Sequence, residues 1–275
     1  MKIFSSKFGR DSSNLKIMLA LMSVSMGALL TSCQTGDSTG GAGDGLKLGV
    51  LAPTTGDLSS IGQNWPAAVQ LAVDTINECG GVNEAQVSLV TEDSQTDPSA
   101  GSSAMTKLAE VDRVAGVVGA FASSVSGAAV DVAVRNNVMM VSPGSTSPVF
   151  TERAQNGEFN GFWARTAPPD TYQSQALAAL ANKEGFKGVA TVAINNDYGV
   201  GFEQQFVKAY QDQGGKVVGK PVRYDPKAAT LDSEARAAFG NGADAVAAVL
   251  YAETGTLLLT DLWLKSWQSP MVKEG

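Results

Sequence analysis

The sequence contains no histidine and only 2 cysteines among its 275 residues. The lack of histidine excludes Ser-His-Asp and Cys-His catalytic groups, and it excludes zinc sites with imidazole ligands. The Gly-x-Ser-x-Gly pattern of a nucleophile elbow is also missing. Paired carboxylates such as Asp93 and Asp97 remain a formal route to catalysis, although loops also use aspartate to form turns. We therefore expect that the protein is not an enzyme.

Loops that bind nucleotide phosphates are missing as well. Gly199-Val-Gly201 follows a predicted strand, but Gln204 stands where the dinucleotide fingerprint has its third glycine. The glycines between Gly56 and Gly62 have the wrong spacing for a phosphate-binding loop, and no lysine follows them. We interpret all of these as turn glycines, and we expect neither a cofactor nor a bound metal.

Positive charge is scarce. The 20 lysines and arginines are outnumbered by 27 aspartates and glutamates, which gives a formal net charge of −7. Phosphate backbones are bound by clustered lysine and arginine, and the sequence has no such cluster. Nucleic acid is therefore not an expected partner.

The N-terminal part has the pattern of an export signal. Lysines and an arginine precede an apolar stretch over residues 17–30, which is too short for a confident membrane span but suits a signal peptide. Leu30-Thr-Ser-Cys33 resembles a lipobox, in which the cysteine receives lipid and becomes the new N-terminus. We expect residues 1–33 to form this signal and the Gly/Ser/Thr/Asp-rich residues 34–45 to form a flexible tether. The mature protein is then extracytoplasmic and lipid-anchored to a membrane.

From residue 46 onward, strands alternate with helices. This order predicts an α/β fold of parallel sheets with helices on both faces. Pro168-Pro169 divides the alternation into two lobes, residues 46–166 and 167–275. The expected strands are 47–52, 85–91, 159–165, 189–194, 217–222 and 245–250, together with two apolar runs that begin at Val114 and Val138. The expected helices are 66–77, 99–111, 172–184, 202–213, 233–239 and 254–265, with residues 195–201 as a loop.

Two neighbouring strands end in hydroxyl-rich loops. Val114–Gly119 leads to Ser123 and Ser124, and Val138–Val141 leads to Ser142, Ser145 and Thr146. Ligands of open α/β sheets bind outside the carboxyl ends of the strands. Helix capping is the alternative role, since serine and threonine are favoured N-caps. The two roles are compatible, because a helix N-terminus also attracts anionic groups.

Four segments together resemble the type I periplasmic binding proteins of ABC transporters, in particular the branched-chain amino acid and amide group. They are Leu48–Gly56 with Ile61-Gly62, Ile76–Val82, Val141–Pro148 and Asn196–Gly199. The resemblance runs from about residue 46 to near the C-terminus. It implies two doubly wound lobes that close on a ligand. Members of this group usually continue further, so we expect the second lobe to be incomplete in this chain.

The resemblance also implies roles for individual residues. Ser123 and Thr146 match positions that meet a ligand's carboxylate and ammonium groups, helped by the backbone at Ser124 and Gly144. Tyr198 matches an aromatic residue of the second lobe that closes over the ligand, and Tyr251 matches another aromatic residue near the polar end of the ligand. The full expected set is Ser123, Ser124, Gly144, Ser145, Thr146, Tyr198 and Tyr251.

Three further positions bear on the ligand. The resemblance places Glu274 near an acidic position that neutralises a ligand ammonium. Glu253, two residues after Tyr251, is a further candidate for ligand contact, with a solvated loop carboxylate as the alternative. Ile61 departs from the pattern, because amino-acid binders often have a tyrosine there, and Trp65 is the alternative source of aromatic surface. This departure weakens the case for a leucine-like ligand.

The expected function is that of a solute-binding lipoprotein of an ABC importer. It captures a small polar solute, such as an amino acid or an amide, and delivers it to permease subunits. The alternative function is a ligand-sensing module of a receptor or regulator with the same fold.

Overall fold

The computed structural model describes residues 45–240 and 242–266, which all belong to one compact unit, Gly43–Gly275. The expected signal peptide with Cys33, all of the tether except Gly45, and Glu274 lie outside the described residues. Within the described part, no helix combines the length and the apolar character needed to cross a membrane.

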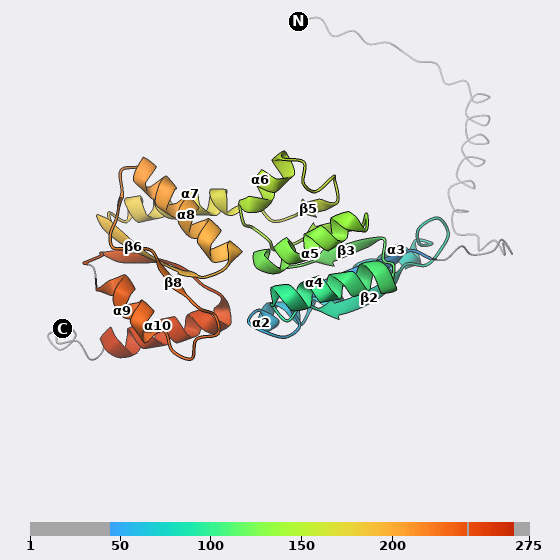
Figure 1. Ribbon diagram of the computed structural model, residues 1–275, viewed down its shortest axis with the longest axis horizontal. Helices are drawn as coiled ribbons and strands as arrows, with labels where there is room; N and C mark the ends of the chain where they lie inside the picture. Colours follow the sequence, from blue (N-terminus) through green and yellow to red (C-terminus); the bar gives the residue numbers. More distant parts are fainter. Residues whose placement is uncertain (1–44, 241, 267–275) are drawn as a thin grey trace, which may run out of the picture. The chain divides into compact units, whose positions relative to one another are not determined.

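The first sheet contains five parallel strands in the order β2-β1-β3-β4-β5 (Figure 1). Because all of its strands are parallel, their carboxyl ends meet at one edge. The strands are β1 (Lys47–Ala52), β2 (Ser88–Asp93), β3 (Gly116–Gly119), β4 (Met139–Ser142) and β5 (Trp163–Arg165). The helices that accompany them are α2 (Ser59–Gly62), α3 (Trp65–Glu78), α4 (Pro98–Thr106) with a π-turn at Lys107–Val111, α5 (Ser123–Arg135) and α6 (Val149–Gln155). We call these elements lobe 1.

The second sheet is built around β6, which pairs in parallel with β7, β8 and β9. Helix α8 contacts β6 and packs on α7, whereas α9 contacts β6 and packs on α10, so helices lie on both sides of this strand (Figure 1). The elements are α7 (Asp170–Lys183), β6 (Gly188–Ile194), α8 (Asp197–Asp212), β7 (Lys216–Val217), β8 (Val222–Tyr224), α9 (Asp232–Phe239), β9 (Ala245–Val249) and α10 (Ala252–Ser266). We call them lobe 2.

Burial explains the most regular element. All seven residues of β6, GVATVAI, are buried, as expected for a central parallel strand covered on both faces. One apolar cluster includes Leu51 and Val130 of lobe 1 together with Ile194 and Tyr224 of lobe 2. A second cluster, around Phe206 and Tyr210, lies between α7, α8 and the second sheet. These clusters fix the strand ends that carry the site.

The α/β class and the strand–helix alternation are confirmed, whereas some local expectations are wrong. Residues 195–201 are not all loop, because α8 already begins at Asp197. The expected strand 159–165 is reduced to β5, and α6 was not anticipated. The expected strand 217–222 is two short strands, β7 and β8, separated by residues 218–221, which include Pro221. Proline lacks the N–H that a continuous strand would need at that point.

Candidate ligand-binding site

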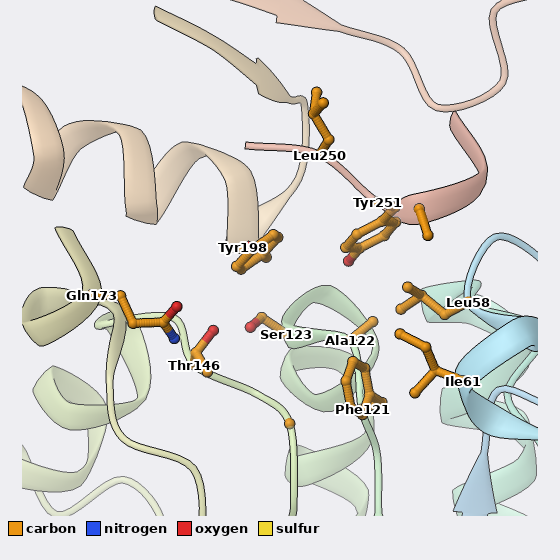
Figure 2. Close-up of a pocket in the computed structure, with 12 residues that line it drawn as sticks. Leu58, Ile61, Phe121, Ala122, Ser123, Thr146, Gln173, Tyr198, Leu250 and Tyr251 are labelled. Carbon is orange, nitrogen blue, oxygen red and sulfur yellow. The ribbon is translucent and has the colours of Figure 1, made fainter. Parts of the chain in front are cut away.

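A cavity of about 220 Å³ lies where the two sheets present their carboxyl ends to each other (Figure 2). Pockets for drug-sized molecules measure roughly 300–1,000 Å³, so this one suits a smaller solute. Both lobes contribute to its wall. The lining residues are Leu58, Ile61, Phe121, Ala122, Ser123, Gly144, Thr146, Gln173, Tyr198, Leu250, Tyr251 and Ala252.

Ser123 and Thr146 supply hydroxyls from lobe 1. Ser123 is the first residue of α5, and Thr146 lies in the loop after β4. Figure 2 shows both hydroxyls pointing toward the same space, with Tyr198 on the opposite side. Ser123 is not a helix cap, because Ala122 occupies the cap position and no side chain caps this helix. Helix capping therefore does not account for the Ser123 hydroxyl.

Ser145 and Ser124 do not line the cavity, although Gly144 does. The Ser145 side chain is fully buried, and its hydroxyl lies 2.7 Å from that of Ser126 and 3.0 Å from the Phe121 carbonyl. The Ser142 hydroxyl is also buried; it donates to the Ala120 carbonyl and accepts the Ser145 N–H at 2.9 Å. These hydroxyls tie the end of β3 to the end of β4.

The loop that carries Thr146 is held by its backbone. The guanidinium of Arg165 donates to the carbonyls of Ser145 and Ser147 at 3.2 and 2.8 Å. The N–H of Asp170 donates to the Thr146 carbonyl at 2.9 Å, and the Thr146 hydroxyl donates to Asp170 Oδ2 at 2.9 Å. Three consecutive carbonyls are thus fixed, which positions the side chain of Thr146.

Asp170 is completely buried. Burial disfavours the ionised carboxylate and raises the pKa of Asp170 to about 6, although the Thr146 hydrogen bond and the nearby Arg165 charge both oppose the rise. Burial also lowers the pKa of Arg165, against the influence of Asp170. Since an unperturbed aspartate has a pKa near 3.8, this rise brings the titration of Asp170 close to neutral pH.

Lobe 2 contributes two tyrosines whose rings lie nearly parallel, with centroids 5.8 Å apart. Tyr198 is in the first turn of α8, and the Tyr251 hydroxyl accepts a hydrogen bond from Asn196 Nδ2 at 3.1 Å. Burial, followed by the charge of Asp170, raises the pKa of Tyr198 to about 12. Burial also raises the pKa of Tyr251. Both phenols are therefore neutral and can donate or accept hydrogen bonds.

The rest of the wall is largely apolar. Leu58, Ile61 and Leu250 line it together with the ring of Phe121. Trp65 does not line the cavity; its ring packs against the edge of Phe121 with centroids 5.1 Å apart. The aromatic surface is thus supplied by Phe121, with Trp65 behind it.

Sequence reasoning missed Phe121, Asp170, Arg165 and Gln173. Phe121 stands two residues before Ser123, so its position in the sequence could have indicated that it lies near the site. Asp170 and Gln173 belong to α7, which the sequence placed only after the proline pair. No local sequence pattern indicates that the first turn of this helix contacts the loop that carries Thr146.

The carboxylates considered for catalysis have structural roles. Asp93 Oδ1 accepts N–H groups of Thr54, Thr55 and Gln95 at 3.0, 3.2 and 2.8 Å. Burial opposes its ionisation, but these bonds and that from the Thr55 hydroxyl lower the pKa of Asp93. Asp97 caps α4, and the Ala100 N–H is the main cause of its lowered pKa. Among the described residues, no group of three or more Cys, Asp or Glu side chains is arranged to hold a metal ion.

Comparisons with known proteins give one consistent result. The profile of the family described as "Periplasmic binding protein" matches residues 45–262. A Leu/Ile/Val-binding protein homolog 2 of Brucella abortus is 33% identical over 172 residues, which are 62% of this chain and 45% of that protein. The leucine-, isoleucine-, valine-, threonine-, and alanine-binding protein of Pseudomonas aeruginosa is 30% identical over 177 residues, 64% of this chain and 46% of that protein. This chain therefore spans about half the length of these relatives.

A solved structure shows the same arrangement. The leucine-binding protein LivK of Thermotoga maritima superposes with a TM-score of 0.71 at 26% identity, covering 80% of this chain and 61% of that one. The chain has two parallel sheets with helices on both sides, and the family profile matches it over residues 45–262. The chain belongs to the periplasmic binding protein family, and its fold is that of the type I members.

Proposed function

We propose that the protein is an extracytoplasmic solute-binding lipoprotein of an ABC importer. It captures a small polar solute, an amino acid or an amide, between its lobes and delivers it to permease subunits. The observation that carries the proposal is the cavity lined by hydroxyls of lobe 1 and tyrosines of lobe 2. A solute held by both lobes stabilises their closed arrangement, which is the form a permease can recognise.

The chemistry of the wall supports this class of solute. Ser123 and Thr146 offer hydrogen bonds to a polar head group, while Phe121, Leu58 and Ile61 offer apolar surface to a side chain. Two of the relatives have names that specify leucine, isoleucine and valine as ligands. A branched-chain amino acid is therefore the first solute to test.

The proposed contacts are Ser123, Gly144, Thr146, Tyr198 and Tyr251. Ser145 supports the site from outside its lining through buried hydrogen bonds, whereas Ser124 is not among the lining residues. Cys33 is the proposed lipid attachment point. Solute binding without chemical conversion is the expected activity, since binding is what the names of the relatives describe.

The test is a thermal-shift screen of amino acids and amides on the full chain. A ligand that binds only the folded state raises the melting temperature by mass action. In Ser123→Ala and Thr146→Ala, the shift caused by a positive compound should be lost while each variant still melts cooperatively. Without ligand, Thr146→Ala should melt below wild type, because it leaves the buried Asp170 carboxylate without its hydroxyl partner.

Thr75→Ala serves as the matched control. Thr75 is exposed on α3, and its hydroxyl bonds to the Leu71 carbonyl of its own helix. This variant should keep the full shift. The same shift in both pocket variants would refute the site, and no shift with any amino acid or amide would refute the proposed function.

A further inference from the structure

Asp170 is joined to Thr146 by two hydrogen bonds that run in opposite directions. Its backbone N–H donates to the Thr146 carbonyl, and its carboxylate accepts the Thr146 hydroxyl, both at 2.9 Å. Its second carboxylate oxygen, Oδ1, is buried and has no hydrogen-bond partner among the described residues. Asp170 does not line the cavity, and its hydrogen bond connects it to the cavity through Thr146, which does line it.

The bond to Asp170 decides what Thr146 can offer to a solute. A hydroxyl has a single proton and two lone pairs. Bonds to an ionised acceptor are stronger than neutral ones, so the carboxylate retains the proton of Thr146. Toward the cavity, Thr146 Oγ1 then presents lone pairs and accepts hydrogen bonds.

Ser123, in contrast, offers a hydrogen-bond donor to the cavity. Its Oγ accepts the backbone N–H of Ser147 at 3.3 Å, and its own proton has no acceptor within the described part of the chain. Ser123 also stands at the N-terminus of α5, where a helix favours negative charge. The two hydroxyls that lobe 1 points into the cavity are therefore a donor at Ser123 and an acceptor at Thr146.

We propose that Asp170 is a positioning residue that holds the Thr146 hydroxyl as an acceptor, so that the site selects solutes with an N–H donor at this point. The inference rests on the proposed function and defines the orientation in which the solute binds. The solute places its carboxylate or carbonyl at Ser123 and its ammonium or amide N–H at Thr146.

Protonation of Asp170 reverses this polarity. A carboxylic acid donates its own proton to Thr146, which frees the threonine hydroxyl to donate into the cavity. The titratable groups coupled to Asp170 are Arg165 on β5, whose charge opposes the rise in the Asp170 pKa, and the phenol of Tyr198 on α8, whose own pKa is raised by Asp170. Neither of them titrates between about pH 5 and about pH 7, so the reversal in that range belongs to Asp170.

Calorimetric titration of the full chain with leucine and with 4-methylpentanoate tests the inference. The second probe is leucine with hydrogen in place of its ammonium group. Because the pKa of Asp170 is about 6, leucine should bind wild type about tenfold more weakly at about pH 5 than on the plateau above neutrality. In Asp170→Asn, leucine should bind weakly with no pH dependence in this range. The preference for leucine over 4-methylpentanoate should also fall.

Asp197→Asn is the matched control, because Asp197 is an exposed aspartate at the first position of α8. It should retain both the preference and the pH profile of wild type. A wild-type preference and pH profile in Asp170→Asn would overturn the inference. If wild type binds no amino acid at any pH, the proposed function fails, and the inference is then decided without ligand.

The ligand-free measurement follows the carboxyl carbon of Asp170 by NMR. The Thr146 hydrogen bond lowers the pKa of Asp170. Thr146→Val removes that bond and should raise the pKa, whereas Thr146→Ser keeps a hydroxyl and should leave it near the wild-type value. The same pKa in all three proteins would show that Asp170 does not hold the hydroxyl.

Discussion

Hydroxyl side chains at the carboxyl edge of the first sheet have two different roles. Ser123 and Thr146 face the cavity, whereas Ser142 and Ser145 are fully buried and bond to neighbouring backbone and hydroxyl groups. Sequence predicted that this edge would carry the site, because the hydroxyls follow adjacent parallel strands. It could not separate the two roles, since both use the same residue types and the difference depends on contacts between separate loops.

At the same scale, Gly144 is required by a close approach. A Cβ at this position would lie 2.3 Å from Cδ2 of Phe121, and that ring is backed by Trp65. We predict that Gly144→Ala lowers the free energy of unfolding by about 1–3 kcal/mol, the usual cost of overpacking. Urea unfolding measures the change.

A double-mutant cycle identifies the cause. In a Phe121→Ala background the added methyl has space, so Gly144→Ala should cost much less there than in wild type. Equal costs in both backgrounds would show that Phe121 is not the obstacle.

At the level of elements, helix N-termini position the groups of the site. Helix α5 begins at Ser123, α7 at Asp170 and α8 at Asp197 beside Tyr198. Sequence placed strand β1 correctly and anticipated helix α3 within one residue at each end, because their apolar patterns and flanking turns are strong. It started α8 five residues late, because Gly199 and Gly201 look like turn residues. In the structure, Gly199 is helical, and an added Cβ would collide with the Ile194 carbonyl.

The start of α8 depends on Asn196. Its Oδ1 accepts the Gly199 N–H at 3.0 Å, and its Nδ2 donates to the Tyr251 hydroxyl at 3.1 Å. We predict that Asn196→Ala costs about 1 kcal/mol of stability through loss of the cap. Asn196→Asp should stay near wild type, because a carboxylate can accept from both Gly199 and Tyr251. Thermal unfolding compares the two variants, and an equal loss in both would contradict a capping role.

For the whole molecule, polar contacts connect the lobes beyond the cavity. Glu253 Oε1 at the start of α10 accepts the backbone N–H of Ser60 in α2 at 3.2 Å. Lys227 lies 3.8 Å from Asp97, but this pair is exposed and contributes little. Glu253 is therefore the more informative position, because its other oxygen is buried without a partner in the described part of the chain.

We predict that Glu253→Ala weakens binding of the solute found in the screen by about two- to tenfold, the usual net value of one hydrogen bond. The physical reason is that the contact joins the lobes, so its loss favours their separation. Calorimetric titration measures the affinity. Glu78→Ala, at an exposed position at the end of α3, is the control and should bind as wild type does. An unaltered affinity in Glu253→Ala would show that this contact does not stabilise closure.

The bond between Asp170 N–H and the Thr146 carbonyl has a further mechanical consequence. The chain passes from β5 to α7 through residues 166–169, so Asp170 is the first helical residue beyond this crossing and remains tied to lobe 1. In a rotation of lobe 2 about the crossing, points near the axis move least and distant points move most. Thr146 would then keep its place beside a solute while the far wall of the cavity swung away. Capture would accordingly begin as binding to an open half-site, and release would begin at the end farthest from Asp170.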